Sequence, residues 1–169
     1  VGYNADDGEW IVGGNSSTAI ISSDGQTFVA SSPGPAAVFG AFDQCISVHW
    51  SSANSLWFIG TNNGQIATSP DGHNWTLRTN PTTSNDVRGI DSISNGRVFV
   101  GTDAGDIKYS DDNGDTWNAA TENGTAITIA DISRVVANAD ESVLVAGAGG
   151  FNQGEFVWRS TDGGASFTS

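Results

Sequence analysis

The chain has 169 residues, enough for one domain with a hydrophobic core. Its 6 basic and 19 acidic residues give a net charge of −13, which argues against binding to nucleic acids or to an anionic membrane surface. No apolar run reaches the roughly 18 residues of a membrane-spanning helix. The 22 glycines, with many Ser, Asn and Asp between short apolar runs, predict an all-β protein rich in turns.

Four segments of similar layout follow one another, and their approximate bounds are 1–35, 36–81, 82–121 and 122–169. Each contains short apolar runs that predict strands. In the first two segments these runs are 1–3, which is the tail of a first strand, then 9–14, 19–21, 28–30, 46–50, 56–60, 65–68 and 75–78. In the last two they are 87–90, 97–101, 106–109, 117–119, 132–136, 143–147 and 156–159.

The second run of each segment is almost continuously apolar and ends in a glycine, namely Gly13, Gly60, Gly101 and Gly147. A continuously apolar strand is expected to be buried on both faces. The terminal glycine allows a neighbouring backbone to approach closely. An insert at 149–154 lengthens the second turn of the last segment.

A polar box follows the third apolar run of every segment. Its pattern is Ser, any residue, Asp, any residue, Gly, any residue, Thr, Trp at 110–117, and it recurs with small changes at 22–28, 69–75 and 160–167. Asp followed by Gly between two strands is a hairpin signal, and the closing aromatic ring can be buried on the sheet. The residues expected to build these turns are Ser22, Asp24, Gly25, Phe28, Ser69, Asp71, Gly72, Trp75, Ser110, Asp112, Gly114, Trp117, Ser160, Asp162, Gly164 and Phe167.

These boxes resemble the Asp-box, or BNR, repeat of sialidases and many other β-propellers. The resemblance covers nearly the whole chain, because the segments between the boxes also align. It implies a β-propeller of four-stranded antiparallel blades, in which the box joins the third and fourth strands as a structural turn. The box aspartates are therefore expected to be structural and not catalytic.

Four blades are few for this family, and both chain ends cut a blade, at 1–3 and 167–169. We therefore expect part of a larger propeller, which agrees with the absence of Met from the chain. The alternatives are a closed ring of four blades, or two chains that complete one ring as a homo-oligomer.

Box spellings such as 66–72 are similar to those of phage tail and other virion proteins, and of photosystem II assembly-factor propellers. The resemblance implies a non-enzymatic structural or binding propeller at a virion or extracellular surface, which contacts glycans or neighbouring proteins. The candidate ligand contacts are Trp50, His49 and Trp158. Exposed indole rings suit sugar rings, and His49 ends a first strand from which it can face the central channel.

The alternative is a fragment of a propeller glycoside hydrolase, because 156–164 resembles a xyloglucanase repeat. Such enzymes need two carboxylates across a cleft, and none of the 19 acids stands out as a pair. A sialidase is disfavoured by the absence of an Arg-Ile-Pro motif. No catalytic residue, metal site or cofactor is assigned, since the two histidines lack metal-ligand spacing and the single Cys45 is expected to be buried.

Overall fold

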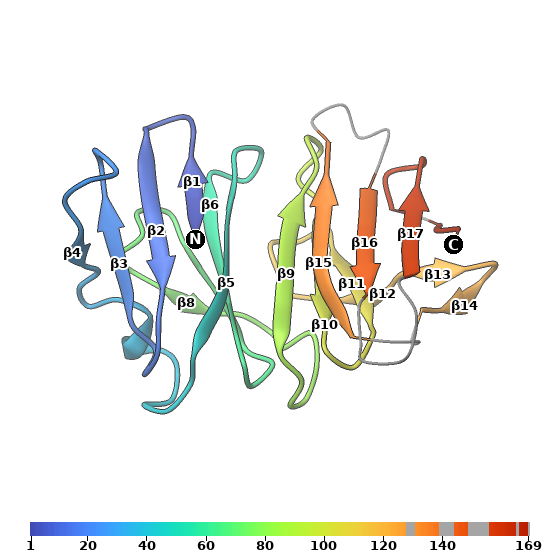
Figure 1. Ribbon diagram of the computed structural model, residues 1–169, viewed down its shortest axis with the longest axis horizontal. Helices are drawn as coiled ribbons and strands as arrows, with labels where there is room; N and C mark the ends of the chain where they lie inside the picture. The colour runs from blue at the N-terminus through green and yellow to red at the C-terminus, as the bar shows by residue number, and fades with distance from the viewer. Residues whose placement is uncertain (128–130, 139–143, 149–155, 165, 169) are drawn as a thin grey trace.

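The computed structural model describes residues 1–127, 131–138, 144–148, 156–164 and 166–168. Within these ranges the strands form successive antiparallel sheets, each paired in chain order (Figure 1). We call each sheet a blade. Blade 1 contains β1 (Gly2–Asn4), β2 (Glu9–Gly13), β3 (Ala19–Ser22) and β4 (Val29–Ala30). After a short 3-10 helix, η1 (Pro35–Ala37), blade 2 contains β5 (Cys45–Ser51), β6 (Leu56–Thr61), β7 (Ile66–Ser69) and β8 (Thr76–Leu77).

The second half of the chain repeats this plan. Blade 3 contains β9 (Val87–Ser92), β10 (Val98–Thr102), β11 (Ile107–Ser110) and β12 (Asn118–Ala119). A small hairpin of β13 (Thr121–Glu122) and β14 (Thr125–Ala126) leads to blade 4, which contains β15 (Ile132–Ala137), β16 (Leu144–Ala148) and β17 (Phe156–Ser160). A bridge from Thr168 to Arg159 supplies the fourth position of this blade. The insert at 149–154 lies outside the described residues.

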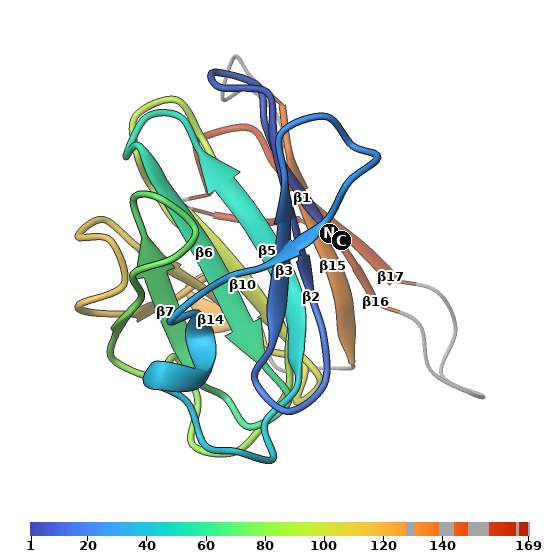
Figure 2. The same cartoon turned by 90° about the vertical axis from the view of Figure 1, so that its left-hand side faces the viewer.

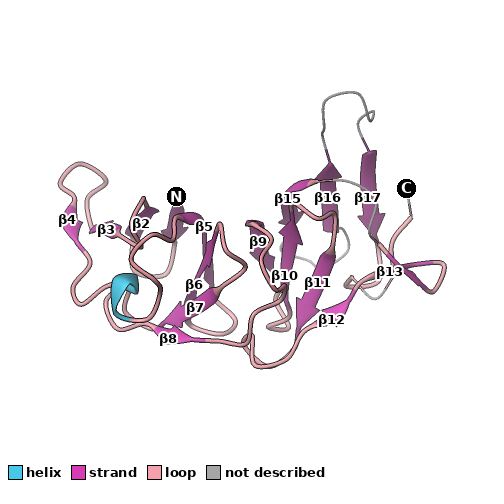
Figure 3. Cartoon of the chain, turned by 90° about the horizontal axis from the view of Figure 1, so that it is seen from below, coloured by secondary structure: helices cyan, strands magenta, loops and turns pink. Residues whose placement is uncertain are grey.

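The blades are arranged as an open fan. Their first strands, β1, β5, β9 and β15, are neighbours along the inner side, and the outer strands spread from β4 at one end to β17 at the other (Figure 3). The fan does not close within the described residues, so the fold is a partial β-propeller. No helix among the described residues is both long and apolar enough to span a membrane.

Glycines at the ends of second strands set the spacing between blades. A Cβ on Gly13 would lie 2.6 Å from the carbonyl oxygen of Cys45, and one on Gly60 would lie 2.7 Å from Cγ1 of Val87. Gly101 faces Ile132 in the same way. In each pair the glycine belongs to one blade and its neighbour to the first strand of the next, so a side chain at the glycine position would push the two blades apart.

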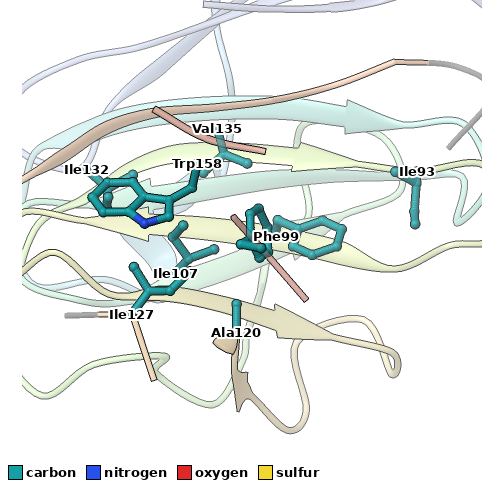
Figure 4. Packing of buried hydrophobic residues seen from close by; sticks show 9 residues of the cluster. Ile93, Phe99, Ile107, Ala120, Ile127, Ile132, Val135 and Trp158 are labelled. Atoms are coloured by element: carbon teal, nitrogen blue, oxygen red, sulfur yellow. The ribbon is translucent and has the colours of Figure 1, made fainter. Parts of the chain in front are cut away.

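The hydrophobic core lies mainly between blades. One cluster joins Ile11 and Ile21 of blade 1 to Trp57 and Trp75 of blade 2, and a second lies between blades 2 and 3. The third surrounds Trp158 and holds blade 4 on blade 3 (Figure 4). The second strands β6 and β10 are buried on both faces, as their apolar sequences predicted, apart from partly exposed Leu56. The corresponding β2 is only half buried.

Candidate functional site

All four boxes are turns that their own side chains hold closed. In blade 3 the Ser110 hydroxyl donates to Asp112 Oδ1 at 2.7 Å and accepts from the backbone N–H of Gly114 at 2.8 Å. The same serine-to-aspartate hydrogen bond occurs in the other boxes, from Ser22 to Asp24, Ser69 to Asp71 and Ser160 to Asp162. The box glycines have positive φ, which glycine adopts at little cost. These aspartates are occupied as hydrogen-bond acceptors within the turns.

The box aromatics differ in burial. Trp75 and Phe167 are buried, whereas Phe28 is 38% exposed, so the expectation that its ring is buried is wrong. The reason is that each box covers the preceding blade. A Cβ on Gly72 would lie 2.7 Å from Cδ1 of Ile11 in blade 1, and Gly164 faces a ring in blade 3. Blade 1 has no preceding blade among the described residues.

The boxes make stability depend on pH in the acid range. Hydrogen bonds from the Thr116 hydroxyl and backbone N–H lower the pKa of Asp112 to about 2. Bonds from the backbone N–H groups of Thr27 and Gln26 also lower the pKa of Asp24 to about 2. A carboxyl whose pKa is lowered by folding stabilises the protein fully above its unfolded pKa of about 3.9 and loses this contribution as the pH falls towards 2. We therefore expect the free energy of unfolding to decline over that interval.

The variant Asp112→Asn is expected to lose about 1 kcal/mol of stability at pH 7, because solvent screens this exposed site. The free energy of unfolding of this variant should also decline less steeply between pH 4 and 2 than that of the wild type. Urea unfolding at a series of pH values measures both effects. Asp106→Asn is the control, since no donor to that carboxylate exists among the described residues. An acid decline as steep in Asp112→Asn as in the wild type would contradict the assignment.

The first strands of the four blades line a hollow of about 520 Å³, which we call the central hollow. Side chains from every blade reach it, including Tyr3, His49, Asp91 and Arg134. It is therefore the place where the fold brings residues from distant parts of the sequence together. The position predicted for His49, facing this channel, agrees with the structure.

His49 links blades 2, 3 and 4. Its Nε2 lies 2.7 Å from Ser92 Oγ, and its Nδ1 lies 3.6 Å from Asp91 Oδ1. Asp91 in turn accepts hydrogen bonds from the backbone N–H of Ser92 at 2.8 Å and of Ala137 at 2.9 Å. Burial lowers the pKa of His49, and the negative charge of Asp91 offsets part of this effect.

The residue types Ser, His and Asp are those of a nucleophilic triad, but the geometry is not. The distance from His49 to Asp91 is too long for a hydrogen bond, and both carboxylate oxygens already accept from backbone N–H groups. Ser92 is also not among the residues that line the central hollow. The group is therefore a tie between first strands.

The other two candidate ligand contacts, Trp50 and Trp158, differ in their exposure. Trp50 is one of the residues that line the central hollow. Its Nε1 donates to Asp6 at 2.9 Å, and the centroid of its ring lies 5.3 Å from that of Trp57, with the two rings tilted by 59°. Trp158 is 0% exposed, so its expected role as a ligand contact is wrong. The side chain lies in the core with Ile132 and is covered by blade 3 (Figure 4).

Sequence reasoning missed Tyr3 as a candidate ligand contact. Tyr3 pairs with Trp10 across β1 and β2, as Trp50 pairs with Trp57 across β5 and β6. It is partly exposed and lines the central hollow. Tyr3 and Trp50 occupy equivalent positions in the repeat, and this equivalence could have identified Tyr3. Recognising it requires the strand register, which is hard to predict from sequence for so short a first strand.

Charged groups at the start of β9 form an ion-pair cluster. Arg88 contacts Asp131 at 2.5 Å, Asp86 at 3.3 Å and Asp103 at 3.8 Å. Arg134, which is exposed in the central hollow, has no carboxylate partner among the described residues. Asp91 is the only carboxylate among the described residues that line the hollow. The lining therefore offers a cation and aromatic rings but no pair of carboxylates.

The described residues offer neither a metal site nor a reactive thiol. Within the described ranges no three His, Cys, Asp or Glu side chains lie close enough to hold a metal ion. Cys45 is buried, as expected, and burial together with the charge of Asp43 raises the pKa of its thiol to about 12. A thiol with so high a pKa is not a nucleophile at neutral pH.

Comparison with known proteins identifies the fold by shape. No protein-family model and no curated protein matches the sequence. Among solved structures, the GH74 xyloglucanase of Xanthomonas campestris is similar with a TM-score of 0.74 and 15% identity, over 98% of this chain and 29% of the other. YCF48 bound to D1 peptide is similar with a TM-score of 0.71 and 18% identity, over 99% of this chain and 52% of the other.

The extracellular domain of the one-component system BT4673 from B. thetaiotaomicron is similar with a TM-score of 0.65 and 16% identity, over 86% of this chain and 20% of the other. This chain thus spans about half or less of the length of each of these proteins. Identities this low show a shared fold alone. The blade order, the open fan and these likenesses together establish an all-β, partial β-propeller.

Proposed function

We propose that this chain is a non-enzymatic structural and binding propeller, which contacts glycans or neighbouring proteins at a virion or extracellular surface. The observation that carries the proposal is the lining of the central hollow. It presents the rings of Tyr3 and Trp50 and the cation of Arg134, which has no carboxylate partner in the described part of the chain. Asp91, the one carboxylate among the described lining residues, accepts from backbone N–H groups.

This lining favours binding over hydrolysis. Glycoside hydrolysis needs an acid and a second carboxylate on opposite sides of the scissile bond. The carboxylates of Asp86, Asp103 and Asp131 form ion pairs with Arg88, and that of Asp6 accepts a hydrogen bond from Nε1 of Trp50. One structural relative is a glycoside hydrolase, but another is described with a bound peptide, so the fold itself serves both kinds of protein.

The lining also indicates the chemistry of a ligand. Aromatic rings stack on sugar rings and on apolar side chains, and a guanidinium pairs with a carboxylate. Arg134 is notable because the chain as a whole carries a charge of −13. A ligand that presents an acidic group beside an apolar ring or face would contact both the guanidinium and the aromatic rings. An acidic glycan and an acidic protein segment are ligands of this kind.

An array of neutral and acidic glycans, probed with the purified chain, tests the binding role. We expect Arg134→Ala and Trp50→Leu each to weaken binding of acidic glycans at least about tenfold, since each removes one type of contact. Arg159→Ala is the matched control, because Arg159 is an exposed arginine that does not line the central hollow.

Two further experiments test for a protein ligand and for hydrolysis of glycans. A photo-crosslinking residue in place of Ser133, which lines the hollow, should capture a neighbouring protein in the native assembly if the ligand is a protein. Release of sugars from xyloglucan or sialylated glycans would refute the non-enzymatic role. Glycan binding that all three variants retain, with no crosslinked protein, would refute the central hollow as the site.

A further inference from the structure

We propose that the joint between blades 2 and 3 holds a second ligand site, which binds a sugar unit that carries a carboxylate. The site is a hollow of about 740 Å³, which we call the rim hollow. The residues that line it include Arg78, Asn80, Thr83, Asn85, Asp106 and Lys108. It shares no lining residue with the central hollow, so this site adds to the binding proposed there and does not depend on it. Figure 2 shows β7 of blade 2 on the side of the molecule away from β1, which borders the central hollow.

The only lysine of the chain lies where the equivalent positions of blades 2 and 4 are apolar. Lys108 follows the residue that pairs with the second-strand glycine, and Ala67 and Trp158 hold the same place in β7 and β17. Ala67 and Trp158 are fully buried. In each case the link before the blade adds an apolar side chain to the same core cluster, Phe39 for Ala67 and Ile127 for Trp158.

The link before blade 3 contributes polar groups instead. It comprises residues 78–86 and crosses from the outer strand β8 to the inner strand β9 (Figure 3). None of these residues, all of which the structure describes, belongs to a hydrophobic cluster. Polar groups in place of apolar contacts give up the free energy of apolar burial. A position that breaks the pattern of its repeat in this way is expected at a functional site.

The ammonium group of Lys108 is anchored but not neutralised. Its Nζ donates to the carbonyl oxygen of Pro81, a buried residue, at 2.6 Å. No carboxylate of the described residues lies within ion-pair distance of it. Its other two N–H groups have no acceptor in the same part of the chain. The ammonium is therefore free to donate two hydrogen bonds to a ligand in the rim hollow.

Arg78 supplies the second cation. Its Nε donates to Thr68 Oγ1 at 2.8 Å and its Nη1 to Asp115 Oδ1 at 2.9 Å. These two bonds fix the plane of the guanidinium and leave Nη2 without a partner among the described residues. Two of the six basic residues thus line one hollow, in a chain whose net charge is −13. Such a concentration of positive charge favours an anionic ligand.

The link that forms one wall of the rim hollow is held in place by both neighbouring blades. Asn85 Nδ2 donates to Thr82 Oγ1 at 3.0 Å, and a Cβ on Gly64 of blade 2 would lie 3.0 Å from Cγ2 of Thr82. From blade 3, Trp117 Nε1 donates to the carbonyl oxygen of Thr79 at 2.9 Å. A wall fixed before binding lowers the entropic cost of ordering it around a ligand.

The mixture of groups indicates an anionic sugar. The cations of Lys108 and Arg78 pair with a carboxylate. Asp106, whose carboxylate has no donor among the described residues, accepts hydrogen bonds from hydroxyl groups and disfavours a doubly charged phosphate. Asn80 and Thr83 both donate to and accept from hydroxyl groups. A hexuronate, which carries one carboxylate and several hydroxyl groups on one ring, matches this lining as a free sugar acid or as a unit of a glycan.

NMR titration of the chain with D-galacturonate tests the site. Isotope-labelled lysine gives one side-chain signal, because Lys108 is the only lysine. We expect this signal to shift saturably, while the indole N–H of Trp50 in the central hollow does not shift. Acetate and D-galactose each lack part of the ligand and should bind at least about tenfold more weakly. A short oligogalacturonate that shifts the same signal would assign the site to units of a glycan, whereas binding of the monomer alone would assign it to a free sugar acid.

The variant Lys108→Ala separates binding from stability, because it introduces the alanine that blade 2 has at position 67. We expect it to bind galacturonate at least about tenfold more weakly, measured on the backbone amide signals of Asn80 and Thr83. Its midpoint of urea unfolding should equal or exceed that of the wild type, since an apolar residue suits this position in the other blades. Lys108→Arg keeps the charge and should retain most of the binding. Arg159→Ala is the matched control, because it removes one charge outside both hollows.

A second variant keeps the test independent of the packing around Lys108. Asn80 is exposed, so Asn80→Ala should leave the fold intact and weaken binding about threefold through the loss of one neutral hydrogen bond. A lysine signal that does not shift, acetate that binds as tightly as galacturonate, or wild-type binding by Lys108→Ala would each overturn the proposal. So would a destabilised Lys108→Ala together with unchanged binding by Asn80→Ala. These signals belong to the rim hollow alone, so failure here is distinguishable from failure of the binding proposed for the central hollow.

Discussion

Replacing Trp57 with alanine is expected to lower the free energy of unfolding by about 3–5 kcal/mol. The indole is fully buried between blades 1 and 2, in a cluster with Ile11, Ile59 and Trp75. Its ring also lies close to the backbone of Gly2, so the cavity would be bordered by backbone that cannot collapse into it. Urea unfolding followed by circular dichroism measures the loss.

The repeat offers a matched control at Trp10. Trp10 pairs with β1 as Trp57 pairs with β5, but no preceding blade covers it among the described residues and it is only partly buried. Trp10→Ala is therefore expected to cost less, about 1–2 kcal/mol. Both variants should be compared with the wild type at one protein concentration. Equal losses at the two positions would contradict the argument that a preceding blade determines burial.

The strands and turns could be predicted because their signals are local. Each box contains the donors and acceptors of its own turn, as the bonds between Ser110 and Asp112 show. The apolar second strands also carried enough information to predict two-sided burial for β6 and β10. These features depend on residues a few positions apart, which a single sequence displays directly.

Burial between blades could not be predicted in the same way. Trp158 and Phe28 were misjudged in opposite directions, since the first is covered by blade 3 and the second has no covering blade. The sequence of a repeat contains the same face in every copy, whether or not a neighbour is present. The contact of His49 with Ser92 was equally out of reach, because it joins two first strands that share no ladder of hydrogen bonds.

The spacing of the blades leads to the second large expected effect, at Gly60. A Cβ there would lie 2.5 Å from Ser47 Oγ and 2.7 Å from Val87 Cγ1. The Ser47 hydroxyl donates to the carbonyl oxygen of Val87 at 2.6 Å and so ties blade 2 to blade 3. Gly60→Val should overpack this contact and break the hydrogen bond, with a combined loss of about 2–4 kcal/mol.

Ala30→Val is the control for added volume, because Ala30 lies exposed in β4 and should change stability by no more than about 0.5 kcal/mol. The stability loss in Gly60→Ala should fall between those of the control and of Gly60→Val, since one methyl group already reaches Val87.

Gly60→Val also tests whether the two halves of the chain unfold together. One core cluster joins blades 1 and 2, another joins blades 3 and 4, and a third, which includes Val87, joins the two halves beside Gly60. Overpacking at Gly60 should weaken this third cluster and so let the halves unfold separately. Amide hydrogen exchange would then show faster exchange in β9 than in β6. A single cooperative transition with unchanged exchange in β9 would mean that the contact at Gly60 does not hold the two halves together.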